Sequence, residues 1–370
     1  MAVPSVKYVS QKISKIRWRP RPKQSLQPSD TFATGSWDDE ENKLSLWQVQ
    51  GQDPGSSRLA EEDALAQNEP QLLCEVQHPG NVMDLCFVTQ EHIATASSTG
   101  SLILYQHHAN LQHVQAVQEW MNLHSSSGRA CPCTAVATCG EDTVVTGGED
   151  GRISLLSPGQ TAPVRVLERA DSCTINSMTF LKQAEVLTVN AFGQLKIFDL
   201  RQNTDTPAQI FSVTEDHWSL LCVDKHPGQP HVVATGGQDG SLTIWDLRQD
   251  RFPMTALEAH ASSMWEVRFH PHHAEHLFTC SEDGSLWHWD GSALTSTLDI
   301  SAKGGGEVNS KHTGHHSPWL GLDASRNKLE ITSILPYKSL PVNTLDIEGA
   351  MLVCGTDSET IYTVTLPQLT

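Results

Sequence analysis

The sequence predicts an all-β protein, a seven-bladed β-propeller, and three observations support this prediction. Seven segments share a pattern of small residues, a polar turn and an alternating apolar strand. A second strand-like segment precedes each of them, and a third often follows. The marker residues Thr146, Thr188, Thr235 and Thr279 follow one another at intervals of 42, 47 and 44 residues. Such intervals are typical of propeller blades, which repeat every 40 to 45 residues or so.

Composition excludes several classes of protein. The chain has 370 residues, a formal net charge of −18 and 38% hydrophobic residues, which is too many for a disordered chain. A protein that binds a phosphate backbone or an anionic membrane surface needs a basic face, so we expect neither partner. The longest apolar runs have the length of strands, and the N-terminus lacks the apolar core of a secretory signal. Nine cysteines show no disulfide spacing, which favours reduced thiols in the cytosol or nucleus.

The repeat assigns the strands of each blade in order. The marker segments lie around Thr34, Thr95, Thr146, Thr188, Thr235, Thr279 and Cys354. The preceding strands begin near Ile13, Val82, Cys133, Ile175, Leu220, Met264 and Val342. Because alternate residues of a strand point to opposite faces, stacked blades bury surface that no single blade could bury. The whole chain, 1–370, is therefore predicted to form one domain.

Turns and closure complete the predicted ring. Asp-Gly pairs begin at Asp150, Asp239 and Asp283, where glycine supplies the positive φ of a tight hairpin. The last repeat ends without an outer strand of its own. Residues 6–9 form a short strand-like segment, and we expect it to close the ring beside the last blade.

Three insertions lengthen the repeat, at 51–70, 122–132 and 292–328. They are rich in small and polar residues, and loops of this length are usually functional or disordered. We expect them to be flexible, and we expect deletion of 295–326 to leave folding intact. The pair Trp319-Leu320 in the last insertion is either a small docking element or a locally packed side chain.

No pattern of reactive or ligating residues predicts chemistry. The chain has no phosphate-binding loop, dinucleotide fingerprint or nucleophile elbow. Adjacent histidines, as at His107-His108 and His272-His273, point to opposite faces of a strand and seldom share a metal. We therefore expect no catalytic residue, no metal, no cofactor and no small-molecule substrate.

Aromatic residues and one charge run are the candidates for partner contact. Trp37, Trp218 and Trp265 fall at or near strand ends, where loops form the rims of a propeller. They either meet a partner or cover the ends of the blade cores. The run from Asp38 to Glu41 is either a solvated turn or part of an acidic rim that attracts basic peptides.

The repeats resemble those of the WD-repeat family. The dipeptides Trp245-Asp246 and Trp289-Asp290 match its signature, and Phe198-Asp199 is a variant. The resemblance implies hydrogen-bonded sets that tie loop, turn and strand together: His260, Thr279, Asp283 and Trp289 in one blade, and Thr235, Asp239 and Trp245 in the blade before it. Other blades depart from the signature, so the fold prediction depends on seven aligned repeats.

Longer strings resemble one branch of that family, the small WD-repeat nucleoporins of the Y-shaped outer-ring complex of the nuclear pore. They include VSQKISKIRWRP from Val9, TFATGSWDDEEN from Thr31, LTVNAFGQLKI from Leu187 and HVVATGGQDGSLTIWDLRQ from His231. The resemblance spans nearly the whole chain and is weakest at 51–70, 106–132 and 292–328. It implies a non-catalytic scaffold that docks on an α-solenoid nucleoporin of the short arm. It also implies roles in nuclear transport and pore assembly, location at the nuclear envelope, and kinetochore location in mitosis.

Two alternatives remain open. The string Trp245-Asp246-Leu247-Arg248 fits the WD-x-Arg pattern of substrate receptors of cullin-type ubiquitin ligases, which makes Arg248 a candidate contact. In the structural interpretation, this arginine ends a strand and pairs with an acid of a neighbouring blade. The second alternative is a reader of basic peptides that uses the acidic rims, and it predicts binding that weakens strongly with salt.

Overall fold

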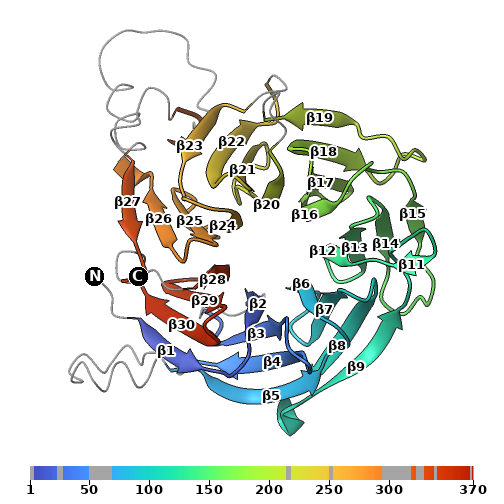
Figure 1. Ribbon diagram of the computed structural model, residues 1–370, viewed down its shortest axis with the longest axis horizontal. Coiled ribbons are helices and arrows are strands. Elements are labelled where there is room, and N and C mark those ends of the chain that lie inside the picture. Colours follow the sequence, from blue (N-terminus) through green and yellow to red (C-terminus); the bar gives the residue numbers. More distant parts are fainter. Residues whose placement is uncertain are drawn as a thin grey trace.

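The chain folds into a ring of β-sheets around a central channel (Figure 1). The computed structural model describes residues 4–22, 28–49, 69–213, 218–249, 253–293, 318–321, 329–336, 340–366 and 369. Within these residues, seven four-stranded antiparallel sheets form seven blades. The prediction of a seven-bladed propeller is therefore confirmed. No helix in the described part is long and apolar enough to cross a membrane.

Each of the first six blades consists of four strands in chain order, from the channel outward. Blade 1 has β2 (Ile13–Trp18), β3 (Thr31–Ser36), β4 (Lys43–Gln48) and β5 (Gln71–Gln77). Blade 2 has β6 (Val82–Phe87), β7 (His92–Ser97), β8 (Leu102–His108) and β9 (His113–Trp120). Blade 3 has β12 (Cys133–Cys139), β13 (Thr143–Gly148), β14 (Ile153–Leu156) and β15 (Arg165–Leu167). Blade 4 has β16 (Ile175–Lys182), β17 (Glu185–Asn190), β18 (Gln194–Asp199) and β19 (Gln209–Ser212).

The remaining blades complete the ring. Blade 5 has β20 (Leu220–Lys225), β21 (Val232–Gly237), β22 (Ser241–Asp246) and β23 (Thr255–Glu258). Blade 6 has β24 (Met264–Phe269), β25 (His276–Ser281), β26 (Leu286–Asp290) and β27 (Glu330–Ser333). Blade 7 has β28 (Val342–Glu348), β29 (Met351–Thr356) and β30 (Thr360–Thr365), and its outer strand is β1 (Ser5–Tyr8).

The N-terminal strand closes the ring, as predicted. β1 pairs antiparallel with β30, with Ser5 opposite Thr363 and Tyr8 opposite Thr360 (Figure 1). The Tyr8 hydroxyl also donates to the Glu359 carboxylate at 2.6 Å. The first and last strands of the sequence thus share one sheet, which covers the edge that β30 would otherwise expose.

Seven hydrophobic clusters hold the blades together, one at each junction between adjacent blades. Close approach at these junctions requires small residues on the second strand. A Cβ added at Gly35 would lie 2.3 Å from Val82 in the next blade, and one at Gly236 would lie 2.5 Å from Met264. The small residues that recur in the marker segments therefore provide space for the neighbouring blade.

Every inner strand carries the same irregularity near its start. In all seven blades, the register of the innermost pair shifts between the first and third residues. The second residue is then the extra residue of a β-bulge, and a bulge re-aims its side chain. We call the side on which the inner strands begin the upper face, and the opposite side the lower face.

The three predicted insertions have different outcomes. Most of 51–70 lies outside the described residues. Residues 122–132 contain the hairpin of β10 (Ser125–Ser126) and β11 (Arg129–Ala130), and the flexibility of this segment stays a prediction. Its local sequence is polar, but the hairpin is fixed by His124, which is fully buried. Of 292–328, residues 294–317 and 322–328 lie outside the described part.

Residues 318–321 of the third insertion form the 3-10 helix η2 (Pro318–Gly321), which packs on the blades. The Trp319 ring is fully buried in the cluster between blades 5 and 6, 5.8 Å from the Phe269 ring. Its indole N–H donates to the Ala274 carbonyl at 2.7 Å. Trp319 is therefore a locally packed core residue in this structure.

Candidate interaction surface

The hydrogen-bonded set expected in blade 6 comes together in the structure. Thr279 Oγ1 lies 2.8 Å from His260 Nε2 and accepts the Trp289 indole N–H at 2.9 Å. Asp283 accepts the backbone N–H of Ala261 at 2.9 Å. These bonds join the loop that precedes blade 6 to the second and third strands of the blade. They therefore fix the loops of this blade on the upper face.

Blade 5 contains part of the same set. The Trp245 indole donates to Thr235 Oγ1 at 2.9 Å, inside the fully buried core. Asp239 accepts the N–H and the hydroxyl of Ser241 at 3.0 and 2.7 Å, which fixes the Asp-Gly turn. The position that corresponds to His260 falls at residue 216, which lies outside the described residues.

A third set in blade 3 escaped the sequence analysis. His124 Nδ1 lies 2.9 Å from Asp150 Oδ1, and His124 Nε2 lies 3.0 Å from Thr146 Oγ1. Burial opposes the charge on Asp150, but its bonds to His124 lower the pKa of the carboxyl overall. Asp150 and Thr146 were visible as turn and marker residues. Their histidine was missed because it lies 22 residues before Thr146, in a segment that reads as a polar insertion.

Two of the three candidate tryptophans share one site on the upper face. Trp37 and Trp265 both line a pocket at the mouth of the channel. The Trp37 indole donates to Asp357 at 3.2 Å, and Trp265 packs against the cluster between blades 6 and 7. Both rings are half-buried, so they cover blade ends and also face the pocket. Trp218 lies apart, just before β20 on the same face, and it is 53% exposed.

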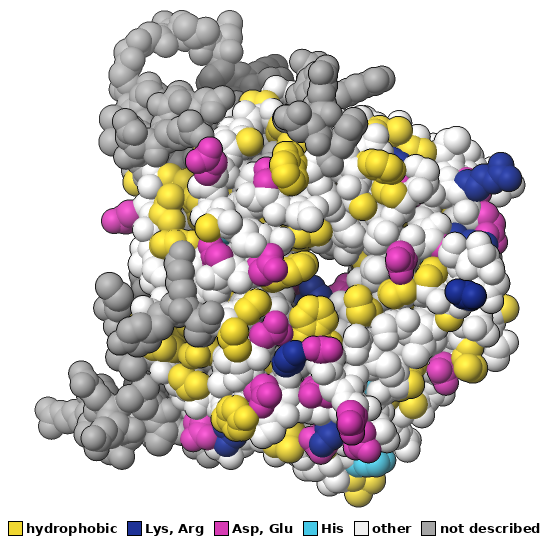
Figure 2. Space-filling view, viewed as in Figure 1, with side chains coloured by type: hydrophobic (Ala, Val, Ile, Leu, Met, Phe, Trp, Pro, Cys, Tyr) yellow, Lys and Arg dark blue, Asp and Glu magenta, His cyan; other side chains and the backbone are white. Residues whose placement is uncertain are grey.

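The mouth has one contributor from each blade. The second residue of every inner strand lines it, namely Ser14, Met83, Thr134, Asn176, Leu221, Trp265 and Asn343. Some of these side chains also tie neighbouring blades together. The Asn176 amide donates to the Leu220 carbonyl at 2.7 Å, and the Asn343 amide donates to the Ile13 carbonyl at 2.9 Å. Figure 2 shows that hydrophobic and charged side chains gather around the central opening on the face in view.

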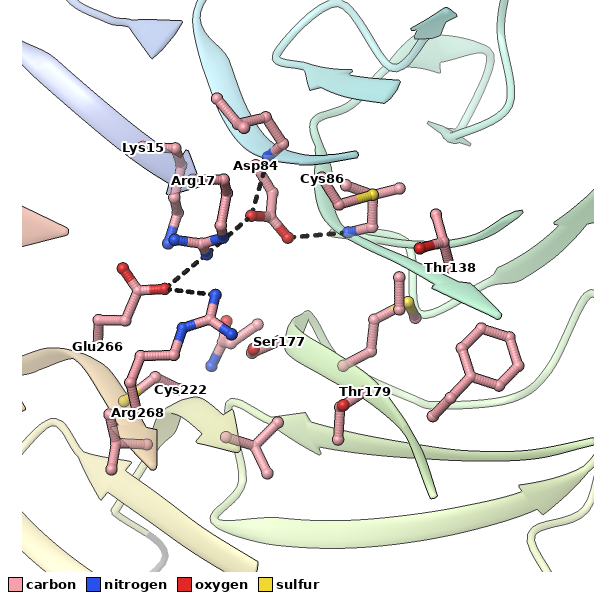
Figure 3. Close-up of a pocket in the computed structure, with 18 of the residues that line it drawn as sticks. Lys15, Arg17, Asp84, Cys86, Thr138, Ser177, Thr179, Cys222, Glu266 and Arg268 are labelled. Carbon is pink, nitrogen blue, oxygen red and sulfur yellow. Dashed lines mark hydrogen bonds and ion pairs between the residues drawn. The ribbon is translucent and has the colours of Figure 1, made fainter. Parts of the chain in front are cut away.

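Charged side chains line the channel beneath the mouth (Figure 3). Glu266 binds Arg17 at 2.5 Å and Arg268 at 3.1 Å, and Arg17 reaches Asp84 at 3.5 Å. Burial opposes the charge on Glu266, but Arg17, Lys15 and Arg268 outweigh it, so the pKa of this carboxyl lies well below its ordinary range. The sequence analysis missed this cluster because its members come from separate blades.

Acids of the inner strands also bind backbone N–H groups of the next blade. Asp84 accepts from Val136 at 3.0 Å, Asp224 from Phe269 at 2.8 Å and Asp346 from Trp18 at 2.7 Å. Burial raises the pKa of Asp224 and of Asp346. These contacts bridge three junctions between blades, and in this position the acids have a structural role.

Arg248 lies on the lower face, away from the tryptophans. Its guanidinium forms a two-point pair with Asp246 of its own blade, at 2.9 and 2.7 Å. Arg201 pairs with Asp199 in the same way in blade 4, at 2.9 Å for both contacts. The expectation that Arg248 pairs with an acid of a neighbouring blade is therefore wrong, because its partner Asp246 belongs to the same blade. Asp199 and Arg248 line a hollow of about 560 Å³ between blades 4 and 5.

Metal ligands and buried thiols are the next groups to consider. No group of three or more His, Cys, Asp or Glu residues within the described ranges is placed to hold a metal. Burial raises the pKa of Cys222 and of Cys354 to about 12, which keeps both thiols protonated and unreactive. The described surface also carries the exposed Trp218 and a channel lined by charged side chains.

Comparison with known proteins gives the family. The WD domain, G-beta repeat family matches residues 208–246 and 251–290, which are the strongest repeats. Nucleoporin Nup43 of Homo sapiens is 49% identical over 373 residues, covering 96% of this chain and 97% of that protein. The chain belongs to the Nup43 family. Nup43 of Mus musculus is 48% identical over the same length, and the nuclear pore complex protein NUP43 of Arabidopsis thaliana is 23% identical over 320 residues.

The extent of this similarity agrees with the fold. Nup43 from Homo sapiens aligns with all seven blades, whereas the WD repeat family matches only two regions. The resemblance to the small WD-repeat nucleoporins is thereby confirmed. Membership of the Nup43 family agrees with a structural protein rather than an enzyme.

Proposed function

We propose that this protein is a non-catalytic scaffold subunit of the nuclear pore, in its Y-shaped outer-ring complex. The observation that carries the proposal is end-to-end similarity to proteins named as nucleoporins, at 49% and 48% identity. In this proposal the propeller docks on an α-solenoid nucleoporin of the short arm. It supports nucleocytoplasmic transport and pore assembly at the nuclear envelope, and acts at the kinetochore in mitosis.

The upper face is the proposed docking surface. Trp218 and Phe192 are 53% and 50% exposed, and both lie on that face, before β20 and in the turn between β17 and β18. Large aromatic side chains supply much of the binding energy at protein interfaces. An exposed pair of them in adjacent blades supports contact with an apolar groove of a helical partner.

Affinity purification of the tagged chain from cells, followed by mass spectrometry, tests this proposal. We expect outer-ring nucleoporins in near-equal amounts, and a loss of at least tenfold with Trp218→Ala. Leu111→Ala is the matched control, because Leu111 is 76% exposed and follows β8 at the lower face. Absence of nucleoporins would overturn the subunit proposal. Unchanged recovery with Trp218→Ala would overturn only the docking surface.

The same purification tests the ubiquitin-ligase alternative. Arg248 is 58% exposed, and its Asp246 partner is fully buried, so the guanidinium is held at the lower surface and keeps one side open. If the protein is a ligase receptor, purification of the unchanged chain should recover a cullin adaptor, and purification of the Arg248→Asp variant should not. Recovery of nucleoporins by the Arg248→Asp variant, with no adaptor in either sample, would contradict this alternative.

The basic-peptide alternative has a weaker structural basis. Asp38 of the acidic run already pairs with Lys12 at 2.5 Å, and Glu359 binds the Tyr8 hydroxyl. These contacts occupy part of the acidic rim between blades 7 and 1. A reader of basic peptides would bind isolated basic peptides with strong salt dependence, and salt-independent or absent binding would exclude it.

A further inference from the structure

The upper mouth of the central channel is a small pocket with unused polar groups. Its volume is about 180 Å³. Sites for drug-sized ligands usually measure about 300 to 1,000 Å³, so the mouth suits one side chain rather than a cofactor. It opens on the same face as the exposed Trp218, so a peptide on that face can reach it.

Lys15 supplies a positive charge at this mouth, near Glu266 but without a direct partner among the described residues. It lines both the mouth and the channel below. Among the residues that the structure describes, none forms an ion pair or hydrogen bond with its ammonium group. An ammonium group has three donors, and none of them has a described acceptor.

The nearby carboxylate of Glu266 cannot accept Lys15, because both of its oxygens are already occupied. One oxygen binds Arg17 and Arg268 at 2.5 and 3.1 Å (Figure 3). The other accepts the Thr344 hydroxyl at 2.6 Å and the Leu345 N–H at 3.0 Å. A carboxylate offers about four acceptor positions, so Glu266 is saturated.

Lys15 is the charged residue among those that line the mouth itself. Below it, Arg17 and Arg268 are held by carboxylates, since Glu266 pairs with both and Asp84 pairs with Arg17. Deeper in the channel, Asp224 and Asp346 are engaged by backbone N–H groups, and Lys225 donates to the Phe180 carbonyl. Lys15 is therefore the described cation of the mouth that is left to attract an anion, while Asp357, the acid behind the mouth, already accepts from Trp37 and Asn343.

Within the part of the chain that the structure describes, two further groups at the mouth are buried without a hydrogen-bond partner. They are the indole N–H of Trp265 and Oδ1 of Asn343. Asn343 is only 5% exposed, and its amide nitrogen donates to Ile13 and to Asp357, which fixes the orientation of the amide. Buried polar groups without partners are costly, so a ligand that supplied an acceptor to the indole and a donor to the amide oxygen would gain binding energy.

We propose that the mouth binds the side chain of a glutamate or aspartate in an extended segment of a partner protein. The carboxylate accepts from Lys15 and from the Trp265 indole, and a backbone N–H of the segment donates to Asn343. Trp37 and Trp265 flank the aliphatic part of the side chain. This inference does not depend on the pore-subunit proposal, because it uses only the geometry of the mouth.

Calorimetric titration of the full chain with two amidated peptides tests the proposal. We expect tetraglutamate to bind with a Kd at least tenfold lower than tetraglutamine, against the net repulsion of an acidic protein. Lys15→Met removes the charge and should raise the Kd for tetraglutamate at least tenfold. Lys12→Met is the matched control, because Lys12 lies on the same face but already pairs with Asp38.

A second readout covers the case in which Lys15→Met does not fold. The indole N–H resonance of Trp265, assigned by its loss in Trp265→Phe, should shift when tetraglutamate is added and stay unchanged with tetraglutamine. Equal binding of the two peptides, or an unshifted Trp265 resonance at saturation, would overturn the proposal. Nucleoporin recovery in the purification above is a separate measurement, so the two proposals fail independently.

Discussion

At the scale of single residues, the fold depends on polar contacts that a strand pattern does not reveal. His124 is the clearest example, because it is fully buried and joins the hairpin of β10 and β11 to the turn at Asp150. Asp150 also accepts the backbone N–H of Ser125 at 2.9 Å. One histidine therefore orders a loop whose own sequence is polar.

His124→Ala should destabilise the protein by about 1 to 3 kcal/mol, because it leaves Asp150 and Thr146 buried with fewer partners. Urea unfolding followed by circular dichroism measures this change. His113→Ala is the control, because His113 is exposed at the start of β9. Equal stability of the two variants would show that the contacts of His124 contribute nothing net.

At the scale of elements, short segments far from the repeat complete its core. β1 supplies the outer strand of blade 7, and η2 supplies Trp319 to the junction of blades 5 and 6. The second finding opposes the expectation that residues 295–326 are dispensable for folding, because that deletion removes a fully buried tryptophan.

Trp319→Ala should lower the free energy of unfolding by about 3 to 5 kcal/mol, the usual cost of truncating a buried aromatic ring. Trp218→Ala is the matched control, since Trp218 is 53% exposed and should change stability little. Trp319→Phe should lower the free energy of unfolding by an amount between those for Trp319→Ala and Trp218→Ala, because it keeps most of the ring but loses the hydrogen bond to Ala274. Thermal unfolding of the three variants ranks their stabilities. Similar melting temperatures for Trp319→Ala and Trp218→Ala would contradict the burial of Trp319 in the core.

At the scale of the whole molecule, buried histidines distributed over several blades make stability depend on pH. Burial lowers the pKa of His78, His226, His270 and His288, in each case to about 4. The ordinary value is about 6.5 in an unfolded chain, so the fold favours the neutral form. Their stabilisation is complete above about pH 6.5 and is lost as the pH falls towards 4.

We therefore expect the free energy of unfolding to decrease between pH 6.5 and pH 4, by about 1 to 2 kcal/mol for each of these histidines at pH 5. Asp224 and Asp346 oppose this change, because burial raises their pKa and their protonation favours the fold. Urea titrations at pH 7, 6 and 5 measure the slope. Stability that stays constant or rises on acidification would show that the carboxyls dominate.

The sequence by itself determined the repeat, and with it the number of blades, the order of strands and the closure by β1. These features follow from local alternation, turn residues and spacing, all of which are read along the chain. The resemblance of the sequence to the WD-repeat family also implied part of the hydrogen-bonded sets, at Thr235 and Trp245 and at Thr279 and Trp289, because these residues match the family's signature.

Only the tertiary structure decided which side chains meet. The ring brings Lys15 and Glu266 into one channel, although 251 positions separate them in the sequence. It also separates Arg248 on the lower face from Trp37 and Trp265 on the upper face, and it draws Trp319 from an apparent loop into the core. The physical reason is that one blade fixes only its own register, whereas the channel mouth forms when seven inner strands each contribute one bulged residue.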